Sequence, residues 1–127
     1  MSEKTTVTAD HIRNVFQRYV ELVTRGDCGA VALLYAEDAT VEDPLGSPLH
    51  RGRDAIREFY RTSAGMVHLE LEGRVRVAGR EAAAAMIARP TGADGMVIEI
   101  VDVMTFNDQG LVTSMRAYWS PDTIYRE

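Results

Sequence analysis

The chain has 127 residues, of which 46% are hydrophobic and 26% are charged, as in ordinary globular proteins. This length predicts a single domain, residues 1–127, with one hydrophobic core. The net charge of −5, with no basic arm to offset it, argues against nucleic acid as a partner.

The chain begins with MSEKTTVTAD, which lacks the apolar run of a signal peptide. No later segment is apolar over the length that a bilayer requires, so no membrane association is expected. Cys28 is the one cysteine, which excludes an intrachain disulfide and fits a reducing compartment. We therefore expect a cytoplasmic protein.

Two helices are expected near the beginning of the chain. In the first, Thr8 is the expected N-cap and Gly26 ends the helix. Its apolar stripe consists of Ile12, Val15, Phe16, Tyr19, Val20 and Val23. The second helix is expected to begin at Asp27 and to present on one face Val31, Leu34 and Tyr35.

A strand, a turn and a third helix complete the first half. The strand is expected at Ala39–Glu42 and the turn at Pro44–Gly46. The third helix is predicted over Asp54–Ser63. Its apolar residues are Ile56, Phe59 and Tyr60.

The second half predicts strands, because apolar and polar residues alternate between glycine-containing turns. The strands are expected at Val67–Leu71, Val75–Val77, Ala82–Arg89, Met96–Phe106 and Leu111–Trp119. A four-residue hairpin loop, Asn107–Gly110, joins the last two. Helices first and strands afterwards predict an α+β fold. In it, a cone-shaped, curved mixed or antiparallel sheet packs one face against the three helices around a deep apolar pocket.

Asp102 interrupts an apolar row in the strand MVIEIVDVMTF. The other residues on its face are Met96, Ile98, Ile100, Met104 and Phe106. If Phe106 pairs with Leu111, Asp102 lies opposite Met115. The inward face of the second strand would then comprise Leu111, Thr113, Met115, Ala117 and Trp119. A carboxyl group there loses hydration, which raises its pKa and lets it donate a hydrogen bond. The alternatives are an aspartate held by backbone N–H groups, or a register in which this face meets water.

Three tyrosines lie on the core-facing stripes of the predicted helices: Tyr19, Tyr35 and Tyr60. Their hydroxyls could satisfy one another, since a buried tyrosine usually finds a hydrogen-bond partner. The alternative is three core aromatics whose hydroxyls reach the rim of the core.

Asp43 directly precedes Pro44, which restricts the backbone of both residues. With Gly46 close behind, Asp43 fits an ordinary turn residue. A carboxylate on such a stiff backbone could also take part in chemistry, and from the residues alone both interpretations stay open.

The remaining polar residues indicate neither a metal site nor a cofactor. The histidines and the cysteine, His11, His50, His68 and Cys28, show no metal-ligand spacing. The sequence contains no glycine-rich phosphate loop, and none of the histidines falls on a pocket-facing stripe.

Five segments resemble bacterial ketosteroid isomerases of the nuclear transport factor 2-like superfamily, in order and in approximate spacing. They are RYVELVTRGD, LLYAEDATVEDPLG, HRGRDAIREFY, IVDVMTFNDQG and MRAYWS, within about residues 10–120. The resemblance implies the cone-shaped fold and the isomerisation of Δ5-3-ketosteroids to conjugated Δ4-3-ketosteroids through a dienolate. It assigns the role of general base to Asp43 and the oxyanion hole to Tyr19 and protonated Asp102.

The resemblance also implies that Tyr60 and Tyr35 connect to Tyr19, that Trp119 steadies the base, and that no metal or cofactor is needed. The candidates for an apolar lining that holds the steroid are Val20, Phe59, Ile100, Met104, Met115 and Trp119. Family members are homodimers through the outer face of the sheet, which is permitted here by Val97, Val101 and Val103.

Residues 74–95 depart from the family pattern, and their alanines could widen the pocket or change how it holds the far end of a ligand. Two other functions are compatible with the same fold. One is a non-catalytic module that binds a steroid or another hydrophobic ligand. The other is a different small-molecule lyase or hydrolase.

Overall fold

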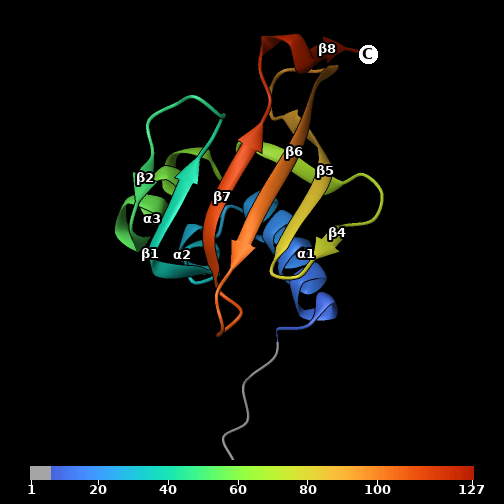
Figure 1. The fold of residues 1–127 in the computed structure, drawn as a ribbon. Helices are drawn as coiled ribbons and strands as arrows, with labels where there is room; N and C mark the ends of the chain where they lie inside the picture. Colours follow the sequence, from blue (N-terminus) through green and yellow to red (C-terminus); the bar gives the residue numbers. More distant parts are fainter. Residues whose placement is uncertain (1–6) are drawn as a thin grey trace, which may run out of the picture.

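The computed structural model describes residues 7–127, which form three α-helices and an eight-stranded sheet (Figure 1). The helices are α1 (Ala9–Arg25), α2 (Cys28–Ala32) and α3 (Arg53–Ser63), with a short 3-10 helix, η1 (Pro121–Thr123). The strands are β1 (Tyr35–Glu42), β2 (His50–Arg51), β3 (Val67–Leu71), β4 (Arg76–Ala78), β5 (Glu81–Pro90), β6 (Met96–Phe106), β7 (Val112–Tyr118) and β8 (Ile124–Arg126). Part of the signal-peptide prediction concerns residues 1–6, which lie outside the described residues. No helix within residues 7–127 has the length and apolar character to cross a membrane.

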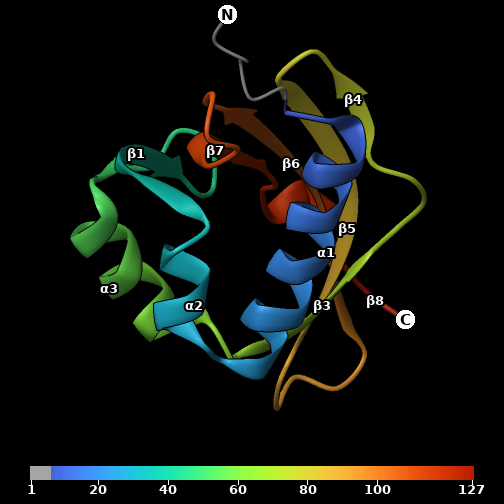
Figure 2. The same ribbon diagram turned by 90° about the horizontal axis from the view of Figure 1, so that it is seen from below.

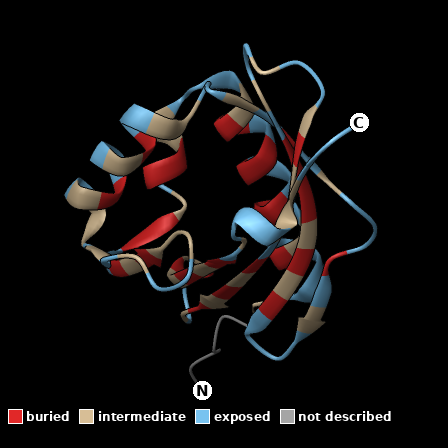
Figure 3. Cartoon of the chain, turned by 90° about the horizontal axis from the view of Figure 1, so that it is seen from above, coloured by how far each residue is buried: buried red, intermediate tan, exposed pale blue. Residues whose placement is uncertain are grey.

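The strands follow the order β2-β1-β7-β6-β5-β3, with β4 beside β5 and β8 beside β6. Neighbouring strands are antiparallel except β1 and β7, which run parallel. The sheet curves around the three helices, which cover its concave side (Figure 2). The buried residues of the helices and of the strands belong to one core cluster, and Figure 3 shows their positions along the chain. The predicted α+β cone is confirmed.

Helix α1 has the predicted ends and the predicted buried face. The Thr8 side chain accepts a hydrogen bond from the backbone N–H of His11 at 3.0 Å, which caps the helix. At the other end Gly26 takes a φ of 82°, and its N–H donates to the carbonyls of Leu22 and Val23. The whole predicted stripe is buried, so α1 is one wall of the core.

Helix α2 is shorter than predicted, and the assignment of Tyr35 to it was wrong. The Asp27 side chain caps the helix by accepting from the N–H of Ala30, but the helix ends at Ala32. Tyr35 instead begins β1 and pairs with Val112 of β7. Apolar spacing over residues 31–35 suits a short helix or a buried strand, and the distant partner β7 decides between them.

Strand β5 forms despite four consecutive alanines, residues that favour helices in isolation. It lies between β6 and β3, and it pairs with β6 over residues 81–88 and with β3 over residues 86–90. Tertiary pairing therefore overrides the local propensity, and the predicted strand is confirmed.

The predicted register of the β6–β7 hairpin was wrong. Phe106 pairs with Val112, and a further irregularity between Thr105 and Phe106 shifts the ladder again. In the loop, the Asn107 side chain accepts from the backbone N–H groups of Gln109 and Leu111, which holds this longer turn. The buried residues of β7 are accordingly Val112, Met115 and Ala117, and Leu111 and Thr113 are only half-buried.

Asp102 consequently lies between Ala84 of β5 and Ala117 of β7, and Met115 lies opposite Met104. The net displacement from the predicted register is two residues, which returns each side chain to the same face of the strand. Asp102 therefore still faces the concave side, as predicted.

Val97 was expected on the outer face of the sheet, but it is completely buried. Strand β8 pairs with β6 over Met96–Ile98 and η1 contacts β6, so the C-terminal segment covers this position. Val101 lies outside this cover and is exposed.

Candidate active site

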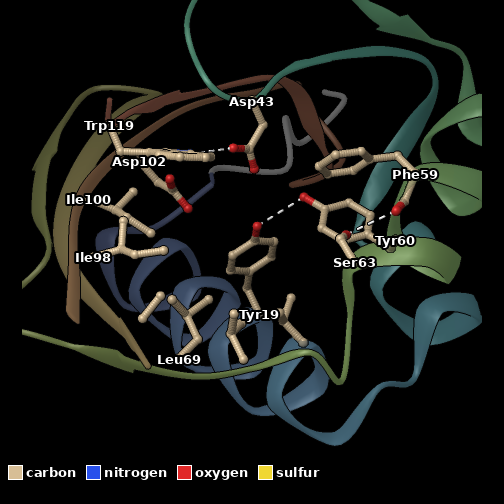
Figure 4. A pocket seen from close by; sticks show the side chains of 13 residues that line it. Tyr19, Asp43, Phe59, Tyr60, Ser63, Leu69, Ile98, Ile100, Asp102 and Trp119 are labelled. Atoms are coloured by element: carbon tan, nitrogen blue, oxygen red, sulfur yellow. Dashed lines mark hydrogen bonds between the residues drawn. The ribbon is translucent and has the colours of Figure 1, made fainter. Parts of the chain in front are cut away.

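A cavity lies between the helices and the concave face of the sheet (Figure 4). Its lining comprises Tyr19, Val23, Asp43, Phe59, Tyr60, Ser63, Val67, Leu69, Ala88, Ile98, Ile100, Asp102 and Trp119. The lining is mostly apolar, and most of its polar atoms belong to the residues singled out in the sequence. The fold therefore brings together Asp43 from the turn after β1, Tyr19 from α1 and Asp102 from β6.

The three tyrosine hydroxyls form a chain of hydrogen bonds. Tyr60 Oη lies 2.9 Å from Tyr19 Oη and 2.8 Å from Tyr35 Oη. All three residues are buried, and burial raises their pKa values well above the usual range, so the phenols keep their protons. The predicted mutual satisfaction of these hydroxyls is present in the structure, although Tyr35 reaches it from a strand.

The three hydroxyls have three protons, but only two hydrogen bonds join them, so one hydroxyl proton is not used between the tyrosines. Within residues 7–127, Tyr35 Oη has no hydrogen-bond partner other than Tyr60, and Tyr35 is completely buried. Because an unpaired buried donor is costly, Tyr35 donates to Tyr60 and Tyr60 donates to Tyr19. The free proton is then that of Tyr19, whose hydroxyl lines the cavity. Because Tyr35 donates to Tyr60 and Tyr60 donates to Tyr19, the hydroxyl of Tyr19 can donate its own proton to a ligand.

Asp43 directly follows β1, in the turn that leads to β2. Its Oδ1 accepts a hydrogen bond of 2.7 Å from Trp119 Nε1. Because β1 and β7 are parallel, the residues after their ends lie side by side, which brings Asp43 and Trp119 together. The backbone N–H of Leu45 donates to the carbonyl of Ala117 at 2.8 Å, which fixes the turn to β7.

Burial raises the pKa of the Asp43 carboxyl, while the hydrogen bond from Trp119 and the charge of His50 lower it. Burial has the larger effect, so the pKa lies above that of an ordinary aspartic acid. A carboxylate with a raised pKa is a stronger base than a carboxylate in water, and it accepts a proton when it is in its ionised form. Asp43 is thus both a turn residue and a basic group facing the cavity.

Asp102 is 3% exposed, and its neighbours across the sheet are alanines that have no side-chain donor. Within residues 7–127, no side-chain hydrogen bond acts on its carboxyl group, which faces the cavity (Figure 4). Burial, and then the negative charge of Asp43, raise the pKa of Asp102 well above its usual range. This shift favours the neutral form of the carboxyl group, which has a proton to donate.

Of the apolar lining residues predicted from the sequence, Phe59, Ile100 and Trp119 line the cavity. Met104 and Met115 do not, because they face each other across β6 and β7 in the closed part of the core. Val20 does not either, since α1 turns it toward a separate surface hollow beside β3. These three assignments were wrong because periodicity predicts which face of an element points inward, but not which inward-facing residues lie at the cavity.

Several lining residues were not predicted. On α1 and α3 they lie one turn beyond predicted ones, as Val23 does after Tyr19 and Ser63 after Phe59, so the helical repeat contains that signal. The segment 74–95 contributes Ala88 to the lining. As predicted, no histidine within residues 7–127 is among the lining residues of this cavity. The His50 ring lies behind the lining, where it stacks on Phe59 with 4.5 Å between ring centroids.

The geometry suits one kind of chemistry. Asp43, Tyr19 and Asp102 point toward a common space in the cavity (Figure 4). A base that faces two neutral donors can remove a proton next to a carbonyl group, while the donors stabilise the enolate oxygen that results. Within residues 7–127, no cluster of three or more His, Cys, Asp or Glu side chains could hold a metal ion.

Known proteins are similar to this chain in both sequence and fold. The SnoaL-like domain family matches residues 16–125. The steroid Delta-isomerase of Nocardioides simplex is 45% identical over 111 residues, which cover 87% of this chain and 90% of the relative. The solved structure of SalBIII is similar with a TM-score of 0.82 and 30% identity, over 91% of this chain and 95% of that one. SalBIII is described as an epoxide hydrolase/cyclase-like enzyme in pyran ring formation in the polyether salinomycin.

Proposed function

The chain belongs to the SnoaL-like domain family, and from that premise we propose that it is a steroid Delta-isomerase. It converts Δ5-3-ketosteroids to conjugated Δ4-3-ketosteroids. The observation that carries the proposal is the convergence of Asp43, Tyr19 and an unpartnered Asp102 in one apolar cavity. The identity of 45% to a steroid Delta-isomerase supports the same activity.

In the proposed mechanism Asp43 is the general base. It removes a proton from the carbon between the carbonyl group and the alkene and returns it to the γ carbon, so the double bond moves into conjugation. One carboxylate serves both transfers, with its backbone held by the turn and its Oδ1 steadied by Trp119. A positioned base contributes about 10²–10⁴ in rate.

Tyr19 and neutral Asp102 form the proposed oxyanion hole. Removal of the first proton leaves a dienolate with negative charge on oxygen, and both groups donate a hydrogen bond to it. Tyr60 and Tyr35 keep the Tyr19 proton directed into the cavity. Loss of one such donor costs on the order of 10²–10³ in turnover in other enzymes.

We also propose a cytoplasmic homodimer that forms through the outer face of the sheet. All groups used in the mechanism come from the chain itself, so the reaction needs neither a metal nor a cofactor. The rigid apolar ligand is held by the lining residues, among them Phe59, Ile100 and Trp119.

The role of Asp43 is tested with the variant Asp43→Asn, which keeps the shape of the side chain and removes the base. We expect turnover of a Δ5-3-ketosteroid, followed by the ultraviolet absorbance of the conjugated enone, to fall by about 10²-fold or more. Binding of a product steroid, measured by calorimetry, should persist. An unchanged rate would show that another group is the base.

The role of Asp102 is tested with a pair of variants. Asp102→Asn keeps an N–H donor in the oxyanion hole, and Asp102→Leu keeps none. We expect the leucine variant to lose about 10²–10³ in kcat and the asparagine variant to lose less. Equal losses in the two variants would mean that Asp102 does not act as a donor.

Two alternatives predict different outcomes in the same assay. A non-catalytic binding module would bind the steroid without any change in absorbance. A hydrolase or lyase on the same fold, such as the similarity to SalBIII suggests, would leave the ketosteroid unchanged and consume an epoxide or alcohol substrate instead.

A further inference from the structure

His50 lies beside Asp43 on the inner side of the sheet. It belongs to β2 and stands opposite Val41 of the antiparallel neighbour β1. Val41 is completely buried, so this face of the β1–β2 pair points inward, and Asp43 follows directly after the end of β1 and lines the cavity. The β1–β2 pairing therefore brings the imidazole ring close to the proposed base.

Helix α3 holds the other side of the His50 ring. The ring stacks on Phe59 at an interplanar angle of 32°, and Phe59 in turn packs edge-on against Tyr60 with centroids 4.9 Å apart. Strand β2 lies between β1 and α3, so both contacts are made from one position (Figure 1). Within residues 7–127 the ring nitrogens of the half-buried His50 form no hydrogen bond and no ion pair.

His50 differs from the other side chains around Asp43 in the charge that it can carry. The side chains that interact with it from the other packed elements are Trp119 after β7, Tyr19 on α1, Tyr60 on α3 and Asp102 on β6. None of these four can carry a positive charge, whereas His50 can. A protonated His50 lowers the pKa of Asp43, in opposition to the effect of burial.

Other charged residues of this corner are directed elsewhere. The Glu42 carboxylate accepts from the backbone N–H of Gly46 at 2.7 Å. The Arg53 guanidinium donates to the carbonyl of Tyr35, and Arg51 is exposed. Within residues 7–127, His50 is thus the residue beside Asp43 whose side chain can bring a positive charge to it.

We propose that His50 is a positioning residue for the base: its positive charge, held between β1 and Phe59, extends toward acid pH the range in which Asp43 is ionised. The proposal deepens the proposed function and rests on the role of Asp43. It predicts that the enzyme keeps activity at a pH where the same cavity without a cation would have lost its base.

Three variants separate charge from packing. His50→Phe keeps a ring on Phe59 without charge, His50→Gln keeps neither, and His50→Arg keeps a planar group with a permanent charge. We expect kcat/KM of the phenylalanine and glutamine variants to be about threefold below that of the arginine variant on the acid limb. The difference should widen as the pH falls, which a packing defect does not produce. Acid limbs that coincide in all three variants, or a phenylalanine variant that matches the parent, would overturn the proposal.

A second measurement needs no turnover. In protein with ¹³C-labelled aspartate carboxyls, the Asp43 signal is assigned by its loss in Asp43→Asn and is then titrated by NMR. We expect the signal to titrate at higher pH in His50→Phe and His50→Gln than in His50→Arg. Identical titrations would refute the coupling even in an active enzyme. A shifted titration in a protein that does not isomerise steroids would refute the proposed function and leave the coupling intact.

Discussion

At the scale of single residues, Asp102 links the proposed chemistry to folding. Burial raises the pKa of its carboxyl group in the folded protein, whereas in the unfolded chain an aspartic acid ionises above about pH 4. Between these two pKa values folding takes up a proton. The stabilisation is complete below the unfolded pKa and is lost as the pH rises toward the folded pKa. Asp43, whose pKa is also raised, contributes in the same direction.

This linkage predicts how the stability of the protein depends on pH. Asp102 should lower the free energy of unfolding by up to about 1.4 kcal/mol for each pH unit above about pH 4, and Asp102→Asn should abolish that part of the slope. Urea titrations at several pH values measure the slopes, with Asp94→Asn, a change at an exposed aspartate, as the matched control. A slope that Asp102→Asn leaves unchanged would mean that Asp102 is ionised in the folded protein.

Residues also show where sequence reasoning stopped. Asp102 was detectable because it interrupts an apolar row, and the tyrosines because they lie on or near core-facing stripes. Asp43 had no comparable signal, and its proposed role came from the resemblance to ketosteroid isomerases. The stacking of His50 on Phe59 depends on the β1–β2 pairing and on how α3 docks, which no local pattern contains.

At the scale of elements, α1 and the end of α3 meet at a pair of glycines. The N–H of Gly65 donates to the carbonyl of Val23 at 2.8 Å, and a Cβ on Gly65 would lie 3.3 Å from Cα of Gly26. Tyr19 lies about two turns before Gly26 and Tyr60 rather more than one turn before Gly65, and their hydroxyls are hydrogen-bonded. The close approach of the helix ends thus helps to hold the two hydroxyls within hydrogen-bonding distance.

The glycine contact is tested by Gly65→Ala, with Gly92→Ala as a matched control. Gly65 and Gly92 have nearly the same φ, 83° and 82°, but a Cβ on Gly92 would meet no atom within 4 Å. Both variants should lose about 1–2 kcal/mol from the left-handed backbone, and Gly65→Ala about 1 kcal/mol or more beyond that from crowding. Denaturant unfolding of the two variants measures the difference. Equal losses would show that the helix ends separate without cost.

The elements themselves were predictable where their determinants are local. The ends of α1 follow from a capping threonine and a glycine, and alternation identified β3 and β6. The end of α2 and the register of the β6–β7 hairpin were not predictable, because β7 captures Tyr35 from far along the chain and the Asn107 loop shifts the ladder.

At the scale of the whole molecule, the helices cover only one face of the sheet. On the other face Val101 and Tyr118 are direct neighbours on β6 and β7, and they are 39% and 40% exposed. Exposed apolar side chains on an uncovered sheet are typical of an interface between protein chains. This face therefore supports the proposed homodimer.

The dimer is tested with Tyr118→Glu. A twofold interface contains each substitution twice, so one added carboxylate per chain should shift the protein toward the monomer in sedimentation experiments. Leu33→Glu places the same charge on an exposed apolar residue outside the sheet and should leave the dimer intact. A parent protein that sediments as a monomer, or equal behaviour of the two variants, would contradict this interface.

The hydrogen bond between Trp119 and Asp43 has a spectroscopic consequence. Trp119 is the one tryptophan of the chain, its indole lines the cavity, and its N–H donates to the proposed base. Its fluorescence therefore originates entirely within the site. The protein contains an intrinsic optical probe whose emission reports the entry of a steroid and the ionisation of Asp43 without any added label.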